Sequence, residues 1–213
     1  AKLCQDRTSG GDATMPNLII LDYQAGNVRS VFRALEMVGA QPRISSDPEE
    51  VRNAQALVFP GQGACDSAMS ILETEGLASA VREFLNRGRP FLGICLGLQL
   101  LLEFAEEGDT PCLGVFEGRV RRLPPGLKVP HMGWNNVKFS NDKNFSKILK
   151  DNRFYFVHSF YVNCFNSENI IVTTNHCFNF TSAVKKNNIY GAQFHPEKSH
   201  YFGKQFLKLF IES

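Results

Sequence analysis

Short apolar runs alternate with helically spaced stretches along the first half of the chain. Three nearly continuous apolar runs are expected to form strands buried on both faces: residues 17–22, 56–59 and 90–94. Apolar side chains then recur every three or four positions, which predicts helices over residues 28–38, 77–85 and 96–104. This alternation predicts an α/β fold of three layers, with helices on both faces of a central, mostly parallel sheet.

The pattern changes beyond residue 113, where the apolar runs become shorter. They predict strands of hairpins and of a sheet edge at residues 118–123, 136–139, 154–162, 170–174, 181–185 and 189–194. A last helix is predicted over residues 201–211. Residues 15–213 are therefore expected to form a single domain, with a smaller antiparallel portion in its C-terminal half. Residues 1–14 are polar and glycine-rich and precede Met15, so we expect a disordered leader or a cloning remnant.

The basic residues change type in the middle of the chain. Ten arginines and one lysine lie between residues 15 and 134, whereas one arginine and nine lysines lie between residues 137 and 213. Both halves face the same solvent, so no demand of one fold explains the change. The hypothesis that follows is a chimeric chain with a seam at residues 134–136. Uniform codon usage across that seam would contradict it.

Composition excludes several classes of protein. The 213 residues are 43% hydrophobic with a formal net charge of +2, which suits one globular domain and provides no basic cluster for nucleic acid. No apolar run approaches the ~18 residues of a membrane helix. The six cysteines form no CxxC pair, so reduced thiols in a cytoplasmic protein are expected. The histidines show no ligand spacing, and neither a metal nor a cofactor is predicted.

Cys95 lies at the predicted passage from the strand at residues 90–94 into a helix. A nucleophile elbow presents its side chain at such a turn, and the flanking Gly93 and Gly97 relieve crowding there. A helix N-terminus also favours thiolate over thiol. The alternative is a small buried hydrophobe, which is the commoner role of an intracellular cysteine.

Two further segments supply what a thiolate nucleophile requires. His195 leaves the end of a predicted strand as a candidate base, and Glu197 can fold back across a rigid proline turn to fix its tautomer. The turn Gly61-Gln62-Gly63 follows another predicted strand, and its backbone N–H groups can face an oxyanion. A surface histidine and an ordinary turn are the alternatives for each segment alone. The prediction of a catalytic site therefore depends on the combination with the cysteine.

These segments resemble the motifs of class I glutamine amidotransferases. GICLGLQ at residues 93–99 is similar to the nucleophile signature of that family, and HPE at residues 195–197 to its catalytic histidine and glutamate. Further stretches resemble one branch, the glutaminase subunits of imidazole glycerol phosphate synthase: DYQAGNVRS at 22–30, PHMGWN at 130–135, YFVHS at 155–159 and QFHPEKS at 193–199. The resemblance runs from about residue 15 to the C-terminus.

The resemblance implies the class I glutamine amidotransferase fold and a cysteine-dependent glutaminase that works in histidine biosynthesis. Cys95 would attack the side-chain amide of glutamine, His195 would move the proton to the leaving ammonia, and Glu197 would orient His195. Backbone amides of the turn at 61–63 and of Leu96 would hold the oxyanion. Glutamine would be bound by Gln99, Glu107, Ser159 and Phe160. A cyclase (β/α)8-barrel subunit would be contacted by Asn27, Trp134, Tyr155 and Lys198.

Alternatives remain open on the sequence alone. The subunit could serve another synthase, although the HMGWN segment is not expected there. An engineered or chimeric scaffold of the same fold could have little or no activity. Trp134 and Tyr155 could be ordinary core aromatics, and Lys198 a plain surface charge.

Overall fold

A parallel sheet forms the centre of the structure, a computed structural model that describes residues 17–24, 27–140 and 153–213. The expected leader at residues 1–14 lies outside these ranges. The strands follow the order β2 (Pro42–Ser45), β1 (Leu18–Leu21), β3 (Ala56–Phe59), β4 (Phe91–Ile94) and β13 (Ile189–Ala192). All but β2 are buried along their whole length. The three continuous apolar runs are thus central strands, as predicted.

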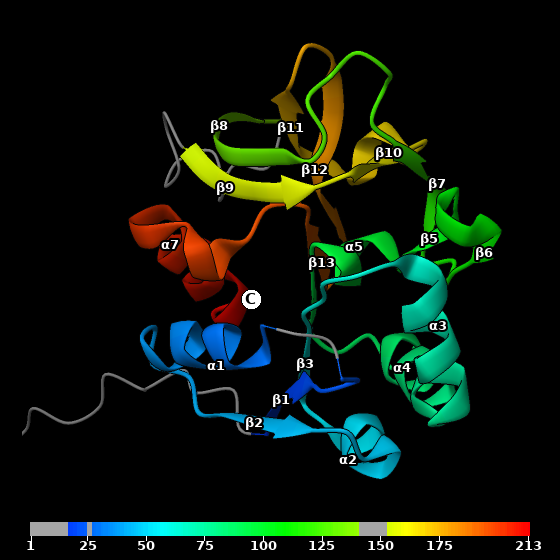
Figure 1. Cartoon of the computed structure of the whole chain (residues 1–213). Coiled ribbons are helices and arrows are strands. Elements are labelled where there is room, and N and C mark those ends of the chain that lie inside the picture. The colour runs from blue at the N-terminus through cyan, green and yellow to red at the C-terminus, as the bar shows by residue number, and fades with distance from the viewer. Residues whose placement is uncertain (1–16, 25–26, 141–152) are drawn as a thin grey trace, which may run out of the picture.

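Helices cover both faces of this sheet (Figure 1). One face carries two helices, α1 (Val28–Glu36) and α7 (His200–Ile211). The other face carries four, α2 (Pro48–Asn53), α3 (Cys65–Thr74), α4 (Leu77–Asn86) and α5 (Leu96–Gln99). Successive side chains of a strand point to opposite faces, so Ile20 packs in the apolar cluster under α1 and α7, and Ile19 packs in the cluster under α2 to α5. The predicted three-layer α/β architecture is confirmed.

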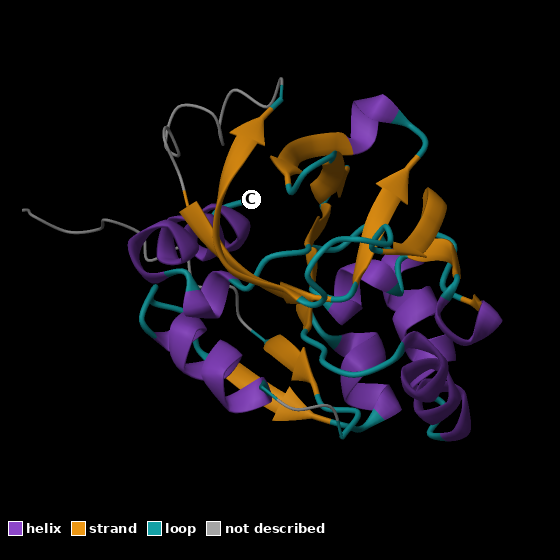
Figure 2. Ribbon diagram, turned by 45° about the horizontal axis from the view of Figure 1, so that its top comes forward, coloured by secondary structure: helices purple, strands orange, loops and turns teal. Residues whose placement is uncertain are grey.

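The second half of the chain extends the parallel sheet with an antiparallel portion (Figures 1 and 2). Its strands are β7 (Phe116–Arg122), β8 (His131–Phe139), β9 (Arg153–His158), β10 (Phe160–Cys164), β11 (Ile170–Asn175) and β12 (Asn179–Lys186). β12 joins this portion to β13 in antiparallel register, while β11, β8 and β9 branch away from the main order. Each strand predicted beyond residue 113 has a counterpart.

Two predicted elements are wrong in extent. The helix expected over residues 96–104 ends at Gln99, and Leu102–Ala105 forms β5, which runs parallel to β7 and also pairs with the short strand β6 (Thr110–Pro111). Leu100 and Leu101, which lie between α5 and β5, are both buried, so the apolar pattern there does not distinguish helix from strand. The strand expected over residues 154–162 is interrupted at Ser159, which divides it into β9 and β10.

Periodicity does not find β2, α2 or α3. β2 and α2 have four and six residues, which is shorter than the window in which a period can be recognised. Local signals do mark the start of α2, because the Asp47 side chain accepts a hydrogen bond from the N–H of Glu49 at 2.8 Å and Pro48 occupies the first turn. Short 3-10 turns complete the described chain at Glu107–Asp109 (η1), Ser167–Asn169 (η2) and Pro196–Lys198 (η3).

Three further expectations concern the chain as a whole. No helix within the described ranges is long and apolar enough to cross a membrane. The five cysteines among the described residues are free thiols. The seam hypothesised at residues 134–136 falls inside β8, which pairs there with β9. Two foreign halves would therefore meet within one hydrogen-bonded strand, and the hypothesis stays a prediction about the coding DNA.

Candidate active site

Cys95 occupies a tight turn between β4 and α5. Its backbone has φ 55° and ψ −104°, a conformation that is rare for a residue with a side chain. A Cβ on Gly93 would come within 2.6 Å of the Gly97 carbonyl oxygen, and a Cβ on Gly97 would lie 1.9 Å from that of Phe59. The N–H of Cys95 donates to the Ala192 carbonyl at 2.7 Å, which ties the turn to β13. The turn has the geometry expected for the predicted nucleophile elbow, and both flanking positions require glycine.

His195 reaches the same edge of the sheet because β13 lies beside β4. The parallel register pairs Ala192 with Ile94, so the residues that follow both strands leave at adjacent carboxyl ends. The turn η3 then folds Glu197 back, and its Oε1 lies 2.7 Å from Nδ1 of His195. Both side chains are buried, at 1% and 0% exposed. Nε2 of His195 has no hydrogen-bond partner among the described residues and is left for proton transfer.

The charge state of His195 suits an activated cysteine. Burial lowers the pKa of His195, but interaction with the neighbouring Cys95 sulfur and with Glu197 outweighs it and raises the pKa to about 10. At neutral pH the imidazole is then protonated beside the Cys95 sulfur. A neighbouring imidazolium is the kind of group that activates a cysteine nucleophile.

The predicted oxyanion segment lies across the pocket from β9. Gln62, Gly63 and Leu96 line the pocket, whereas Gly61 is buried behind them. A Cβ on Gly61 would meet the Tyr23 hydroxyl at 2.3 Å and the Leu96 side chain at 2.7 Å, so only glycine allows this approach. The N–H of Leu96 belongs to the first turn of α5, where backbone donors have no partner within the helix. Donors from two segments are therefore available near the thiol.

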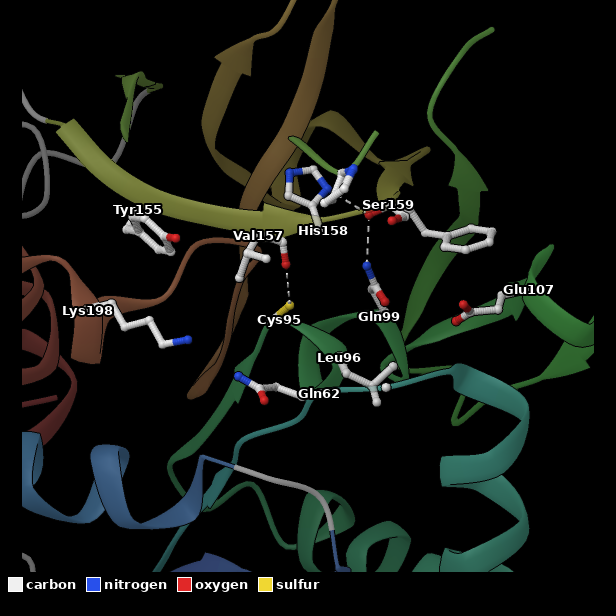
Figure 3. A pocket seen from close by; sticks show the side chains of 13 residues that line it. Gln62, Cys95, Leu96, Gln99, Glu107, Tyr155, Val157, His158, Ser159 and Lys198 are labelled. Carbon is white, nitrogen blue, oxygen red and sulfur yellow. Dashed lines mark hydrogen bonds between the residues drawn. The ribbon is translucent and has the colours of Figure 1, made fainter. Parts of the chain in front are cut away.

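A pocket of about 430 Å³ opens in front of Cys95 (Figure 3). All four predicted glutamine-binding residues line it: Gln99, Glu107, Ser159 and Phe160. The Gln99 amide nitrogen donates to the Phe160 carbonyl at 2.9 Å and to Oε1 of Gln193 at 3.3 Å. Oε2 of Glu107 accepts from the N–H of Cys65 at 2.8 Å, which also stabilises the start of α3.

The four residues predicted to face a partner do not form one group. Tyr155 and Lys198 line the pocket, on the opposite side of Cys95 from Glu107 (Figure 3). Trp134 is 41% exposed and stacks on His200 with 5.3 Å between ring centroids. The core-aromatic alternative is therefore wrong for Trp134, and Tyr155 is half-buried.

Asn27 lies outside this pocket and contacts Glu197 directly. It precedes α1 with φ 80°, and its side chain makes no capping bond to that helix. Its amide nitrogen instead donates to Oε1 of Glu197, the oxygen that also accepts from His195. The sequence places Asn27 near Glu197 by no local signal, because 170 positions separate the two residues.

Sequence reasoning missed several residues that line or adjoin the pocket. Pro130, Val157 and His158 are lining residues, and Gln193 lies behind them with its amide nitrogen 3.7 Å from the Cys95 sulfur. The Cys95 thiol lies 3.9 Å from the Val157 carbonyl oxygen. All four belong to the segments PHMGWN, YFVHS and QFHPEKS, so the signal was present in motifs whose individual residues had no assigned role.

Comparison with known proteins identifies the family of this chain. Residues 19–212 match the family described as Glutamine amidotransferase class-I. The chain therefore belongs to the class I glutamine amidotransferases. Its similarity extends to proteins named imidazole glycerol phosphate synthase subunit HisH. The one from Methanosarcina barkeri is 45% identical over 203 residues, covering 93% of this chain and 99% of the relative. Those from Listeria innocua and Acinetobacter baylyi are each 44% identical, covering 92% and 93% of this chain and 95% and 98% of the relatives.

Solved structures support the fold. A crystal structure described as a glutamine amidotransferase superposes with a TM-score of 0.74 at 17% identity, covering 93% of this chain and 100% of the other. The structure of PurLQS from Thermotoga maritima gives a TM-score of 0.71 at 18% identity, covering 93% of this chain and 98% of that one. At these identities the likeness concerns the fold alone.

Proposed function

We propose that this chain is the glutaminase subunit of imidazole glycerol phosphate synthase. It would hydrolyse L-glutamine to glutamate and supply ammonia to a cyclase (β/α)8-barrel subunit in histidine biosynthesis. The observation that carries the proposal is the Cys95, His195 and Glu197 arrangement beside a pocket, in a chain 45% identical to a HisH subunit. Membership of the amidotransferase family supports the reaction, and the names of the relatives support the partner.

The first half of the reaction uses the thiolate–imidazolium pair. The Cys95 sulfur attacks the amide carbon of glutamine, a C–S bond forms, and the carbonyl electrons move onto the oxygen. The N–H of Leu96 and those of the turn at residues 61–63 stabilise this oxyanion. His195 gives its Nε2 proton to the amide nitrogen, the C–N bond breaks, and ammonia leaves. The carbonyl re-forms as a glutamyl thioester.

The second half returns the enzyme to its starting state. His195, now neutral, takes a proton from water, and the resulting hydroxide attacks the thioester carbon. The C–S bond breaks, glutamate is released, and the Cys95 thiolate again faces an imidazolium. Oε1 of Glu197 accepts the Nδ1 proton of His195 throughout, with 2.7 Å between the oxygen and the nitrogen, so that Nε2 stays directed at the reacting atoms.

The pocket suits a small polar amino acid. Its volume of about 430 Å³ is near the low end for small-molecule sites. The carboxylate of Glu107 complements an α-ammonium group, and Ser159 adds a hydroxyl beside the backbone of Phe160. Gln99 is already bonded to the Phe160 carbonyl and needs no reorganisation to define that wall.

The surface proposed to face the barrel subunit includes Tyr155, Lys198 and Trp134. Tyr155 and Lys198 belong to the pocket wall, and the exposed Trp134 ring lies 6.0 Å from that of Tyr155, edge to face. Tryptophan and tyrosine are enriched at protein interfaces, so an exposed tryptophan beside a tyrosine supports an interface here. A barrel subunit bound there would cover the pocket and receive the ammonia without loss to solvent.

One experiment tests reaction and partner together. Glutamate release is measured for the wild-type chain and for Cys95→Ala, with and without the barrel subunit and its nucleotide ligand. We expect low activity alone, strong stimulation by the liganded barrel, and no activity in Cys95→Ala. A glutamine-analogue alkylator should label Cys95 in the stimulated complex. Full activity that ignores the barrel would contradict the partner, and absence of labelling and turnover would contradict the reaction.

A further inference from the structure

His131 and His158 are two buried histidines to which the proposed mechanism assigns no step. They come from the segments PHMGWN and YFVHS and lie directly opposite each other in the β8–β9 register. Each is 5% exposed, and Nδ1 of His131 lies 2.9 Å from Nε2 of His158. One of these nitrogens must carry a proton and the other must not. Their remaining hydrogen bonds decide which.

The hydrogen bond between His158 and Phe160 determines which nitrogen of each ring carries the proton. Nδ1 of His158 lies 2.8 Å from the Phe160 carbonyl oxygen. A carbonyl oxygen only accepts, so Nδ1 carries the proton. In the neutral ring Nε2 of His158 is then bare and accepts from Nδ1–H of His131. Nε2 of His131 is left as an acceptor.

The hydrogen bonds of Asn135 independently assign the same protons to the two rings. The Asn135 amide oxygen accepts from the N–H of Asn136 at 2.8 Å, and the amide nitrogen donates to the Asn175 carbonyl at 2.9 Å. These two bonds settle the orientation of the amide. The same nitrogen lies 3.2 Å from Nε2 of His131 and donates to it. Hydrogen bonds therefore run without conflict from Asn135 through both rings to Phe160.

The Phe160 carbonyl joins this chain of hydrogen bonds to the glutamine pocket. It accepts a second bond from the Gln99 amide at 2.9 Å, and Gln99 and His158 both line the pocket (Figure 3). The carbonyl lies just after Ser159, where the strand is interrupted between β9 and β10. Phe160 is the first residue of β10 and pairs with Arg122 of β7, and the side chains of His158 and Gln99 both donate to its carbonyl.

We propose that His131 and His158, each neutral with its proton on Nδ1, are positioning residues that hold the Phe160 carbonyl and, through it, Gln99 for glutamine binding. The inference rests on the proposed glutaminase function and adds to it the residues that shape the substrate wall. Protonation of either ring would place an N–H group against another donor. Burial is the largest cause that lowers the pKa of His131 to about 4 and that of His158 to about 3, with His176 adding to both. Both rings are thus neutral at physiological pH.

The tautomer is the first test, and it uses the wild-type chain. Histidine ¹⁵N shifts at neutral pH should show His158 with Nδ1 protonated and Nε2 bare. The assignment uses His158→Gln to identify the lost signals. A His158 protonated on Nε2, or a cationic His158, would overturn the proposal whatever the variants do.

The second test is a matched pair of substitutions at His131. Asn and Leu have the same branched shape, but only Asn places an N–H near the position of Nδ1. In the complex with the liganded barrel subunit, H131L should raise the KM for glutamine on the order of tenfold, as expected for an unpaired buried acceptor on His158. H131N should recover most of that loss, and kcat should change little in either variant.

Equal KM values for H131L and H131N would also overturn the proposal. Near-ultraviolet circular dichroism establishes whether each variant is folded, and the tautomer measurement decides the matter if H131L does not fold. Absence of turnover in the wild-type complex would instead contradict the proposed function, so the two failures are distinguishable.

Discussion

Asn27→Gly is expected to slow glutamine hydrolysis while the fold is preserved. The Asn27 amide donates to Oε1 of Glu197, which is also the acceptor for His195. The Glu197 side chain is fully buried, and its Oε2 has no hydrogen-bond partner among the described residues. Removing the Asn27 amide therefore leaves a buried carboxylate with the His195 ring as its one side-chain donor in the described structure. Glycine keeps the positive φ of 80° without steric cost.

The magnitude follows from the kind of bond that is lost. A hydrogen bond to a charged group contributes about 1.5–3 kcal/mol, and 1.36 kcal/mol corresponds to a factor of ten in rate. Glu197 stabilises the imidazolium form of His195, which donates the proton to the amide nitrogen that leaves as ammonia. If the loss falls on that step, kcat decreases between about tenfold and a hundredfold, with little change in the KM for glutamine.

Asn17→Gly provides the matched control. Asn17 also has a positive φ, 60°, but its amide donates to the Asn53 carbonyl instead of the triad. Both variants are assayed for glutamate release with saturating barrel subunit and nucleotide ligand, and their affinity for the barrel is measured separately. Wild-type kcat in Asn27→Gly would refute the positioning role. If that variant also bound the barrel more weakly, the interface role implied by the family resemblance would be supported instead.

Three other predictions address the elbow, the buried histidines and the partner surface. Gly97→Ala should lower the free energy of chemical unfolding by more than about 3 kcal/mol, because the new Cβ would overlap a carbonyl oxygen of β3. Gly88→Ala meets open space and should cost about 1 kcal/mol, so similar losses in the two variants would refute the packing argument. The pKa values of His131 and His158 in the folded chain lie below the unfolded value of 6.5, so their contribution to stability is present above pH 6.5 and is lost as the pH falls toward 4. The free energy of unfolding should therefore decrease over that range, and it should decrease less steeply in H131N. Trp134, the one tryptophan of the sequence, should show a blue-shifted emission when the barrel subunit binds, and unchanged emission at saturation would exclude it from the interface.

The amino-acid sequence by itself determined what depends on neighbouring residues. Continuous apolar runs identified β1, β3 and β4, since a strand buried on both faces has no polar side. The Gly-x-Cys-x-Gly pattern around Cys95 predicted the elbow, because Gly93 and Gly97 approach each other across the turn. The HPE segment likewise predicted the bond between His195 and Glu197, which the structure places at 2.7 Å.

The tertiary structure decided what depends on residues far apart in the chain. α5 ends early at Gln99 because Leu102–Ala105 pairs with β7 as β5, a pairing that the local sequence does not express. The Asn27 bond to Glu197 joins positions 170 residues apart, and the bonds from Asn135 to Phe160 cross two strands and a break. Side-chain hydrogen bonds form only where packing brings donor and acceptor within about 3 Å, and no local pattern encodes that distance. The triad could therefore be predicted residue by residue, whereas the groups that hold it and its pocket in place became visible only in the folded chain.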